Sequence, residues 1–315
     1  MPDLRAVVHP DEVRHLLNQH FGTPVVNLTP VDGGQVARTF AFLVGEQEYI
    51  IRFNKDNMLT SNLPKEAYLS QKLAATRIPI PPILHVGRLG ELHFAISRKV
   101  PGQMAQTFSA QEIKQLLPQL IEMLDSIHHI DVSDTRGYGV FNYQGRGLAS
   151  NWQDFLAIIA KEEDERDYFG KWYHLFDDTF LERDFFKNIY RRMCSLLEYC
   201  PTERYFVHGN YSLHNILIQD GRITAVLDWV DARYGDFVYD IAGLDFWYPW
   251  LNVREAFQHY YEEQQVELPF YKERLLCYEC YTALSGLRFF AQTGDEPSYQ
   301  IVRSLIQLKL GSFAL

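Results

Sequence analysis

Hydrophobic residues follow two different patterns on either side of about residue 100. Before it, runs of β-branched and aromatic residues alternate with turn pairs such as Gly45-Glu46, and they predict antiparallel strands at 37–44, 48–53, 83–87 and 92–100. One segment, 65–75, has its apolar residues at helical spacing and predicts a helix that interrupts the strands. The first 100 residues therefore predict a small sheet with one main helix.

Beyond Pro101-Gly102, apolar positions recur with the helical period. This pattern predicts helices at 113–130, 152–160, 185–199, 253–263 and 271–290. Pro118 lies inside the first of these, where it is expected to kink the helix or delay its start. We therefore expect an α+β chain with two unequal parts, an N-terminal sheet lobe at 1–100 and a larger, mainly helical lobe at 101–315.

Composition narrows the classes of partner. The 315 residues include 30 Lys plus Arg and 40 Asp plus Glu, which gives a formal net charge of −10. A general nucleic-acid binder needs a basic surface, so this balance argues against nucleic acid as a partner, and a cationic small molecule fits the sign better. The chain has no apolar N-terminal signal region and no apolar stretch of about 18 residues. We expect a cytoplasmic, monomeric protein without a membrane partner.

The four cysteines do not form a recognisable metal or disulfide pattern. Cys277 and Cys280 form a CxxC without a second pair or nearby histidines, inside an aromatic, helix-like run. We expect buried thiols on a helix.

One strong hairpin signal lies within the helical half. Strand-like residues 216–219 and 222–227 are joined by Asp220-Gly221, which places Asn215 opposite about Val226 and close to Asp228. An amide and a carboxylate at one end of a hairpin suit Mg²⁺, which takes one or two protein oxygens and otherwise keeps water and phosphate. From the hairpin alone, a cap or turn role for both residues is an equally good interpretation.

The residues around this hairpin form a longer motif. His208-Gly209-Asn210 is followed by Asn215, then Asp228-Trp229, and then by Gly235-Asp236 and Asp240. This order resembles the catalytic core of the aminoglycoside phosphotransferases, relatives of the protein kinases. Further matching fragments extend along nearly the whole chain and are most similar to the hygromycin B branch of the family: Ile80-Pro81, Ile96-Ser97-Arg98, Gly137-Tyr138-Gly139, residues 221–226 and Trp247-Tyr248-Pro249-Trp250.

The resemblance implies a bilobal, protein-kinase-like fold that binds ATP between its lobes. It implies that Asn215 and Asp228 hold Mg²⁺, while Asp236 and Asp240 brace the catalytic loop. The implied reaction transfers the γ-phosphoryl group of ATP to a hydroxyl of a cationic aminoglycoside, which confers resistance.

Asn210 departs from the family pattern, which has an aspartate that accepts the proton of the attacking hydroxyl. An amide can orient a hydroxyl but cannot take its proton at neutral pH. General-base assistance is worth on the order of 10²–10⁴ in rate, so we expect impaired catalysis. Three alternatives stay open: another small-molecule kinase of the superfamily, a non-catalytic ATP-binding protein, and a drug-sequestering protein.

Candidate nucleotide contacts lie in the first lobe. Gly33, Gly34 and Gln35 take the place of the family's loop over the phosphates, although a plain hairpin turn is the better interpretation of these residues alone. Strand alternation separates Arg52 from Ile51 and Phe53, and Arg52 stands where the kinase fold has its phosphate-binding lysine. Glu66 is the candidate partner of Arg52, with an exposed helical glutamate an equally good interpretation. Arg98 and Val100 belong to the linker that would receive adenine, and an ordinary linker is the alternative.

The acceptor site is predicted from acids and aromatic residues that follow Asp228. Carboxylates and aromatic faces suit the ammonium groups and sugar rings of an aminoglycoside. Asp236, Asp240 and Asp245 lie in this region, the first two being better interpreted as scaffold. The candidates for substrate contact are Asp231, Trp247 and Trp250.

Overall fold

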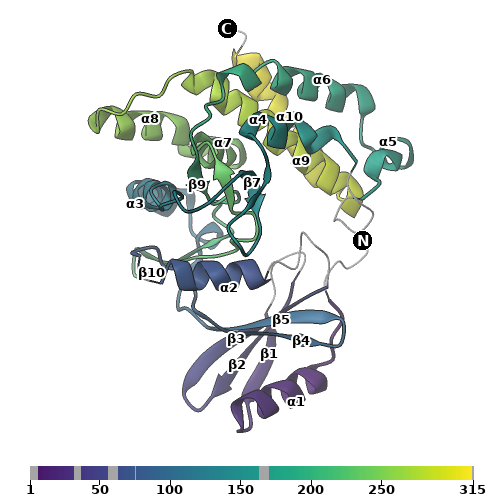
Figure 1. The fold of residues 1–315 in the computed structure, drawn as a ribbon, viewed down its shortest axis with the longest axis vertical. Coiled ribbons are helices and arrows are strands. Elements are labelled where there is room, and N and C mark those ends of the chain that lie inside the picture. The colour runs from purple at the N-terminus through teal and green to yellow at the C-terminus, as the bar shows by residue number, and fades with distance from the viewer. Residues whose placement is uncertain (1–5, 32–36, 56–62, 75, 163–169, 314–315) are drawn as a thin grey trace.

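The computed structural model describes residues 6–31, 37–55, 63–74, 76–162 and 170–313. It has an N-terminal sheet lobe and a larger helical C-terminal lobe, with α2 between them (Figure 1), which confirms the predicted fold class. The N-terminal sheet is antiparallel in the order β1-β2-β3-β5-β4. Its strands are β1 (Val26–Val31), β2 (Arg38–Val44), β3 (Gln47–Lys55), β4 (Ile83–Leu89) and β5 (Leu92–Arg98).

Strand alternation sorts the side chains of β3 between two faces. Ile51 and Phe53 are fully buried and pack with Val13 and Leu17 of α1 (Pro10–Phe21), a helix that the hydrophobic pattern did not predict. Arg52 points to the opposite face, as alternation predicts. That face carries α2 (Leu63–Lys72).

The buried face of α2 packs into the hydrophobic core of the C-terminal lobe. Leu69 is fully buried, and together with Leu73 and Ile78 it joins the same hydrophobic cluster as the helices beyond residue 100. The helix therefore contributes to the core of the larger lobe, although it precedes residue 100 in sequence and its Ser70 hydroxyl also accepts the N–H of Ile83 in β4.

The C-terminal lobe is built around a long central helix, α9, which packs against α6, α7 and α10. Its α-helices are α3 (Ala110–His128), α4 (Trp152–Ala157), α5 (Leu175–Asp178), α6 (Arg183–Cys194), α7 (Val238–Trp247), α8 (Val253–Glu263), α9 (Tyr271–Thr293) and α10 (Glu296–Phe313). Short 3₁₀ turns occur at η1 (Ala105–Thr107), η2 (Ile158–Ala160), η3 (Trp172–His174), η4 (Leu197–Tyr199) and η5 (Pro249–Leu251).

Two small antiparallel sheets complete this lobe. One has the order β11-β10-β6 and the other β8-β7-β12-β9. Their strands are β6 (Gln103–Met104), β7 (Tyr138–Phe141), β8 (Gly147–Ala149), β9 (Tyr205–Val207), β10 (Ile216–Gln219), β11 (Arg222–Val226) and β12 (Arg233–Gly235). Within the described residues, no helix combines the length and apolar character needed to cross a membrane.

Two local expectations have clear outcomes. Helix α3 begins at Ala110, where Ser109 and Glu112 form a capping box, so Pro118 lies inside the helix and does not delay its start. Cys277 and Cys280 are buried free thiols on α9, as predicted.

Candidate active site

Asn215 and Asp228 flank the open end of the β10–β11 hairpin. The Leu227 N–H donates to the Asn215 carbonyl oxygen at 2.7 Å, and Ile216 pairs with Val226. An irregularity after Leu217 shifts the register, so Asn215 lies opposite Leu227, one position beyond the predicted Val226. Asp228 follows at once with φ of 57°, a left-handed conformation that Asp tolerates better than most residues. The hairpin therefore brings the two predicted metal ligands to the same end.

His208 ties the loop at 208–215 to this hairpin. It is fully buried, its Nδ1 accepts the N–H of Asn210 at 3.3 Å, and its Nε2 lies 3.1 Å from the carbonyl oxygen of Leu227. A carbonyl oxygen can only accept, so Nε2 carries the proton and the ring is neutral. Burial lowers the pKa of His208 to about 4. This histidine therefore fixes Asn210 relative to the residue before Asp228.

Asp240 of α7 holds the same loop from the other side. Its carboxylate accepts the backbone N–H groups of His208 at 2.8 Å and Gly209 at 2.7 Å, and the Nε2–H of His128 at 3.1 Å. Burial opposes ionisation, but the hydrogen bond and charge of His128 outweigh it and lower the pKa of Asp240. Asp240 is thus a scaffold acid, the role that the family resemblance implies.

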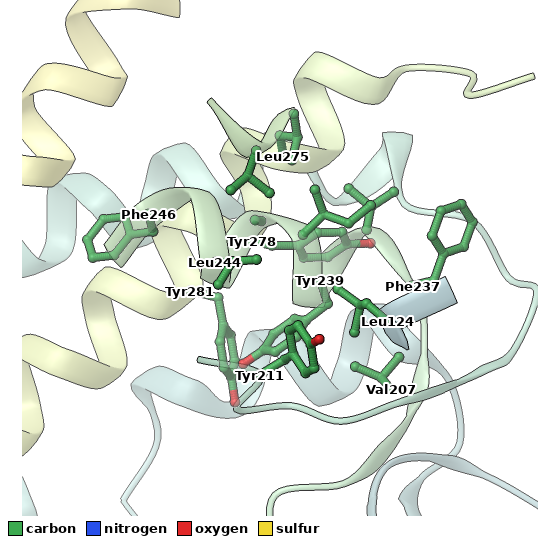
Figure 2. Close-up of a cluster of buried hydrophobic side chains, with 14 of the residues drawn as sticks. Leu124, Val207, Tyr211, Phe237, Tyr239, Leu244, Phe246, Leu275, Tyr278 and Tyr281 are labelled. Atoms are coloured by element: carbon green, nitrogen blue, oxygen red, sulfur yellow. The ribbon is translucent and has the colours of Figure 1, made fainter. Parts of the chain in front are cut away.

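The hydrophobic core anchors both flanks of the loop. Val207 and Tyr211 lie in one cluster with Leu124 and Tyr239 (Figure 2), and the Tyr211 hydroxyl donates to the Leu120 carbonyl oxygen at 3.0 Å. Asn210 between them is exposed. The loop therefore presents the Asn210 side chain to solvent from a rigid base.

Arg52 and Glu66 form an ion pair between β3 and α2. The Glu66 side chain is 9% exposed and that of Arg52 26%, so the Arg52 side chain as a whole keeps some access to solvent. The Glu66 carboxylate raises the pKa of Arg52, and Asp228 contributes in the same direction. The structure therefore brings together Arg52, its predicted partner and the predicted metal ligand at the junction of the lobes.

The environment of Asp228 favours a bound cation. Loss of water around its carboxyl raises the pKa of Asp228 to about 7, and the carboxylates of Glu66 and Asp231 add to this effect. The Nδ2 of Asn215 donates to the Asn210 carbonyl oxygen at 3.0 Å, so its amide oxygen is the atom that can ligate a cation. Among the described residues, no group of three or more His, Cys, Asp or Glu side chains forms a metal cage. One carboxylate and one amide fit Mg²⁺, which retains water and phosphate ligands.

The predicted linker lies between β5 and the β10–β11 hairpin. Arg98 ends β5, and Val100 is partly buried in the segment that leads to β6. Gly102 has φ of 135°, and a Cβ there would lie 2.7 Å from the hydroxyl of Thr224, which donates to the Pro101 carbonyl oxygen. The linker is thus held against the larger lobe. The predicted phosphate loop residues Gly33, Gly34 and Gln35 lie outside the described residues.

The candidate acceptor residues divide by exposure. The Asp231 side chain is 46% exposed and stands 3.6 Å from Arg233. Trp250 is 38% exposed and packs edge-on to Tyr248, whose hydroxyl accepts the N–H of Leu213 in the 208–215 loop. Trp247 packs partly buried against the core, within 3.7 Å of where a Cβ of Gly286 would lie. Asp231 and Trp250 therefore remain available to a ligand, whereas Trp247 faces the packed helices.

Most acids that follow Asp228 are already neutralised inside the fold. Asp236 receives two bonds from Arg274, and Asp245 pairs with Arg254 and Lys309. Asp236 is thus a scaffold acid, as interpreted from the sequence, whereas the expected place of Asp245 at the substrate entrance is wrong, because buried carboxylates need internal cations. Among the described acids of this stretch, the partly exposed ones are Asp228 and Asp231.

Lys65 and Arg233 also shape the site, and the sequence analysis missed both. Both are buried: Lys65 donates to the carbonyl oxygens of Val230 and Ala232, and Arg233 donates to that of Asp231. In sequence, Lys65 is an ordinary helical lysine beside Glu66. The signal that could have found it is its position next to a candidate site residue.

Comparisons with known proteins show the family of this chain. The model of the phosphotransferase enzyme family matches residues 27–274. Hygromycin-B 4-O-kinase of Escherichia coli is 34% identical over 248 residues, which are 78% of this chain and 69% of that protein. The crystal structure of a thermostable mutant of aminoglycoside phosphotransferase APH(4)-Ia, in ternary complex with AMP-PNP and hygromycin B, aligns with a TM-score of 0.81 and 30% identity, covering 96% of this chain and 99% of that one.

A more distant structure shares the fold alone. The putative fructosamine-3-kinase from Haemophilus somnus 129PT aligns with a TM-score of 0.64 at 16% identity over 93% of this chain and 96% of that one. The family match, the identity to a hygromycin kinase and the two-lobed site point the same way: the chain belongs to the phosphotransferase enzyme family and is a transferase of the aminoglycoside phosphotransferase type.

Proposed function

We propose that this protein transfers the γ-phosphoryl group of ATP to a hydroxyl of hygromycin B or a closely related aminoglycoside. The observation that carries the proposal is the convergence of Arg52, Asp228 and the 208–215 loop at the junction of the lobes. The similar APH(4)-Ia structure contains AMP-PNP and hygromycin B, which supports this pairing of ligands.

Arg52 is the group that we expect to bind the nucleotide phosphates. Glu66 orients its guanidinium, the Arg52 side chain as a whole stays partly exposed, and a guanidinium can fork onto two phosphate oxygens. Asn215 and Asp228 would hold Mg²⁺, which, when bound, neutralises charge on the transferring phosphoryl group. Arg98 and Val100 in the linker are the expected neighbours of adenine.

The transfer forms a bond between the acceptor oxygen and the γ-phosphorus and breaks the bond from that phosphorus to ADP. The proton of the acceptor hydroxyl must leave at the same time. Asn210 is exposed and positioned by His208 and Asn215, so it can orient the hydroxyl, but its amide cannot accept the proton. We therefore propose that the proton passes to solvent, slowly.

A cationic acceptor would meet Asp231 and Trp250. The exposed part of Asp231 can bind an ammonium group, and the face of Trp250 can pack against a sugar ring. These contacts explain how an acidic protein could select an aminoglycoside although Asp236 and Asp245 are internally paired.

A paired assay of this chain and its Asn210→Asp variant, with ATP, Mg²⁺ and hygromycin B, tests the proposal. Restoring the carboxylate is expected to raise kcat by about 10²–10⁴ because it supplies a general base, with a smaller change in KM. Phosphorylated hygromycin B is measured by mass spectrometry. The matched variant Asn210→Ala should show no such gain. If Asn210→Asp yields no phosphorylated product, the proposed reaction is wrong.

Asn210 favours one second candidate, a nucleotide-binding protein without transfer activity. That function predicts tight binding of Mg²⁺ and ATP by calorimetry and no product from either chain. Turnover by the Asn210→Asp variant with another hydroxyl compound, and not with hygromycin B, would instead identify a different small-molecule kinase.

A further inference from the structure

Lys65 is an ionisable side chain enclosed inside the protein, and burial lowers its pKa to about 7. It is 0% exposed, and its Nζ donates to the carbonyl oxygens of Val230 at 2.8 Å and Ala232 at 2.6 Å. The same Nζ stands 4.2 Å from the centre of the Phe141 ring. Among the described residues, no carboxylate lies within ion-pair distance of it. Two carbonyl oxygens and an aromatic face therefore hold this amine in a site closed to solvent.

The two carbonyls belong to the loop that carries Asp228, in which Trp229 is also buried against Phe206 and His208. The 228–232 loop leaves β11 and reaches β12 without joining a sheet, and it begins with Asp228 in a left-handed conformation. Inside the loop, the Ala232 N–H donates to the Trp229 carbonyl oxygen, while the Asp231 carbonyl oxygen accepts from Arg233. Lys65 satisfies the remaining carbonyls at Val230 and Ala232. It therefore supplies the side-chain hydrogen bonds that tie the backbone of this loop to α2.

The loop also presses directly on the 208–215 loop. A Cβ at Gly209 would lie 2.2 Å from the Asp231 carbonyl oxygen, so only glycine allows the two backbones to approach this closely. A displacement of the 228–232 loop would thus move Asp228 and, at the same time, separate Asp231 from Gly209, the residue before Asn210.

Lys65 and Glu66 are neighbours on α2 but point to different partners. Successive residues on a helix project about 100° apart, so Glu66 reaches Arg52 on β3 while Lys65 reaches the 228–232 loop. Lys72 is the last residue of the same helix, and its Nζ lies 3.0 Å from the Asp134 carboxylate of the larger lobe. The helix is thus a rigid spacer between the phosphate-binding arginine and the loop that carries Asp228.

We propose that Lys65 is a positioning residue that holds the 228–232 loop and so sets the place of Asp228 relative to Arg52. This inference rests on the proposed function, because it assigns Mg²⁺ to Asp228 and nucleotide phosphates to Arg52. Lys65 itself touches neither ligand.

The test compares the full chain with its Lys65→Met variant, which keeps the length and apolar stem but removes the charge and the donors. Hydrogen exchange without any ligand is expected to speed up by about tenfold or more in peptides covering 228–235, because the loop loses its tie to α2. Calorimetry with ADP, with and without Mg²⁺, is the second measurement. The gain in ADP affinity that Mg²⁺ gives should fall by about tenfold, while metal-free ADP binding should change little.

The matched control is Lys72→Met, which also removes an α2 lysine that contacts the larger lobe but leaves the 228–232 loop alone. It should change neither the exchange of 228–235 nor the effect of Mg²⁺. Should Lys65→Met not fold, Lys65→Gln keeps two N–H donors without the charge and should give an intermediate exchange rate.

The outcomes separate the two proposals. Unchanged exchange and an unchanged Mg²⁺ effect in a folded Lys65 variant would overturn the positioning role. If the unmodified chain shows no Mg²⁺-dependent gain in ADP binding, the proposed function fails instead, whatever the exchange of the loop.

Discussion

A buried neutral histidine links the stability of the site to pH. His208 has a pKa of about 4 in the folded protein because of burial, whereas a histidine in the unfolded chain titrates near 6.5. Between these values the unfolded state binds a proton that the folded state does not. The contribution of His208 to the free energy of unfolding is therefore complete above about pH 6.5 and is lost as the pH falls toward 4.

His208→Gln should weaken this pH dependence. Between pH 7 and pH 5, the loss of unfolding free energy should be smaller by about 2 kcal/mol in the variant than in the unmodified chain. Urea unfolding at the two pH values measures the difference. His259→Gln, at an exposed histidine paired with Glu263, is the control and should keep the original dependence. An identical pH dependence in His208→Gln would mean that His208 is not held neutral.

Helix α9 is joined to the site through a buried ion pair. The Asp236 carboxylate, just after β12, accepts two bonds from the Arg274 guanidinium at 2.8 and 2.6 Å and one from the Tyr278 hydroxyl at 2.5 Å. Both charged side chains are almost fully enclosed. This ion pair orients the start of α7, and Asp240 of α7 accepts the backbone N–H groups that hold the 208–215 loop.

Asp236→Asn should therefore cost about 3–5 kcal/mol of unfolding free energy, because it leaves the charge of Arg274 buried and unpaired. Asp177→Asn removes half of an exposed pair with Arg183 and should cost less than about 1 kcal/mol. Denaturant unfolding of both variants provides the comparison. Similar costs for the two would show that burial does not decide the strength of the Asp236 pair.

Elements with a clear period were predictable from the sequence. The helix predicted at 253–263 is α8, and the one predicted at 271–290 is α9, which continues to Thr293. The Asp220-Gly221 turn fixed the β10–β11 hairpin but not its bulge, because one extra residue in a strand leaves no mark in a short pattern. The four-stranded sheet of the larger lobe was missed, since strands of three or four residues carry too little alternation.

The candidate site was predictable where chemistry and spacing coincide. His208, Asn215 and Asp228 lie within one short stretch of sequence, and the structure brings them together at the end of the hairpin. Lys65 reaches the same place from 165 residues away, where its Nζ donates to the Val230 carbonyl oxygen. Every residue type has such a backbone acceptor. Backbone acceptors carry no sequence signature, so such a contact can be found only in the folded chain.

The distribution of hydrophobic contacts divides the molecule differently from the chain order. Leu69 precedes residue 100 but is buried in the C-terminal core, whereas Ile51 is buried between the sheet and α1. All five tryptophans lie between Trp152 and Trp250, so their fluorescence reports on the larger lobe. We therefore propose that α2 is energetically part of that lobe, and that it meets the sheet lobe through the Arg52–Glu66 pair and through the Ser70 hydroxyl, which accepts the N–H of Ile83 in β4.

Leu69→Ala should lower the stability reported by tryptophan fluorescence by about 2–5 kcal/mol, because it opens a cavity in the C-terminal core. Ile51→Ala removes an equally buried aliphatic side chain. It should shift the fluorescence transition less and instead speed hydrogen exchange in β2 and β3. Denaturant unfolding and exchange of both variants give the comparison. If Ile51→Ala moves the fluorescence transition and Leu69→Ala leaves it in place, α2 belongs energetically to the sheet, and the junction of the lobes lies on its other side.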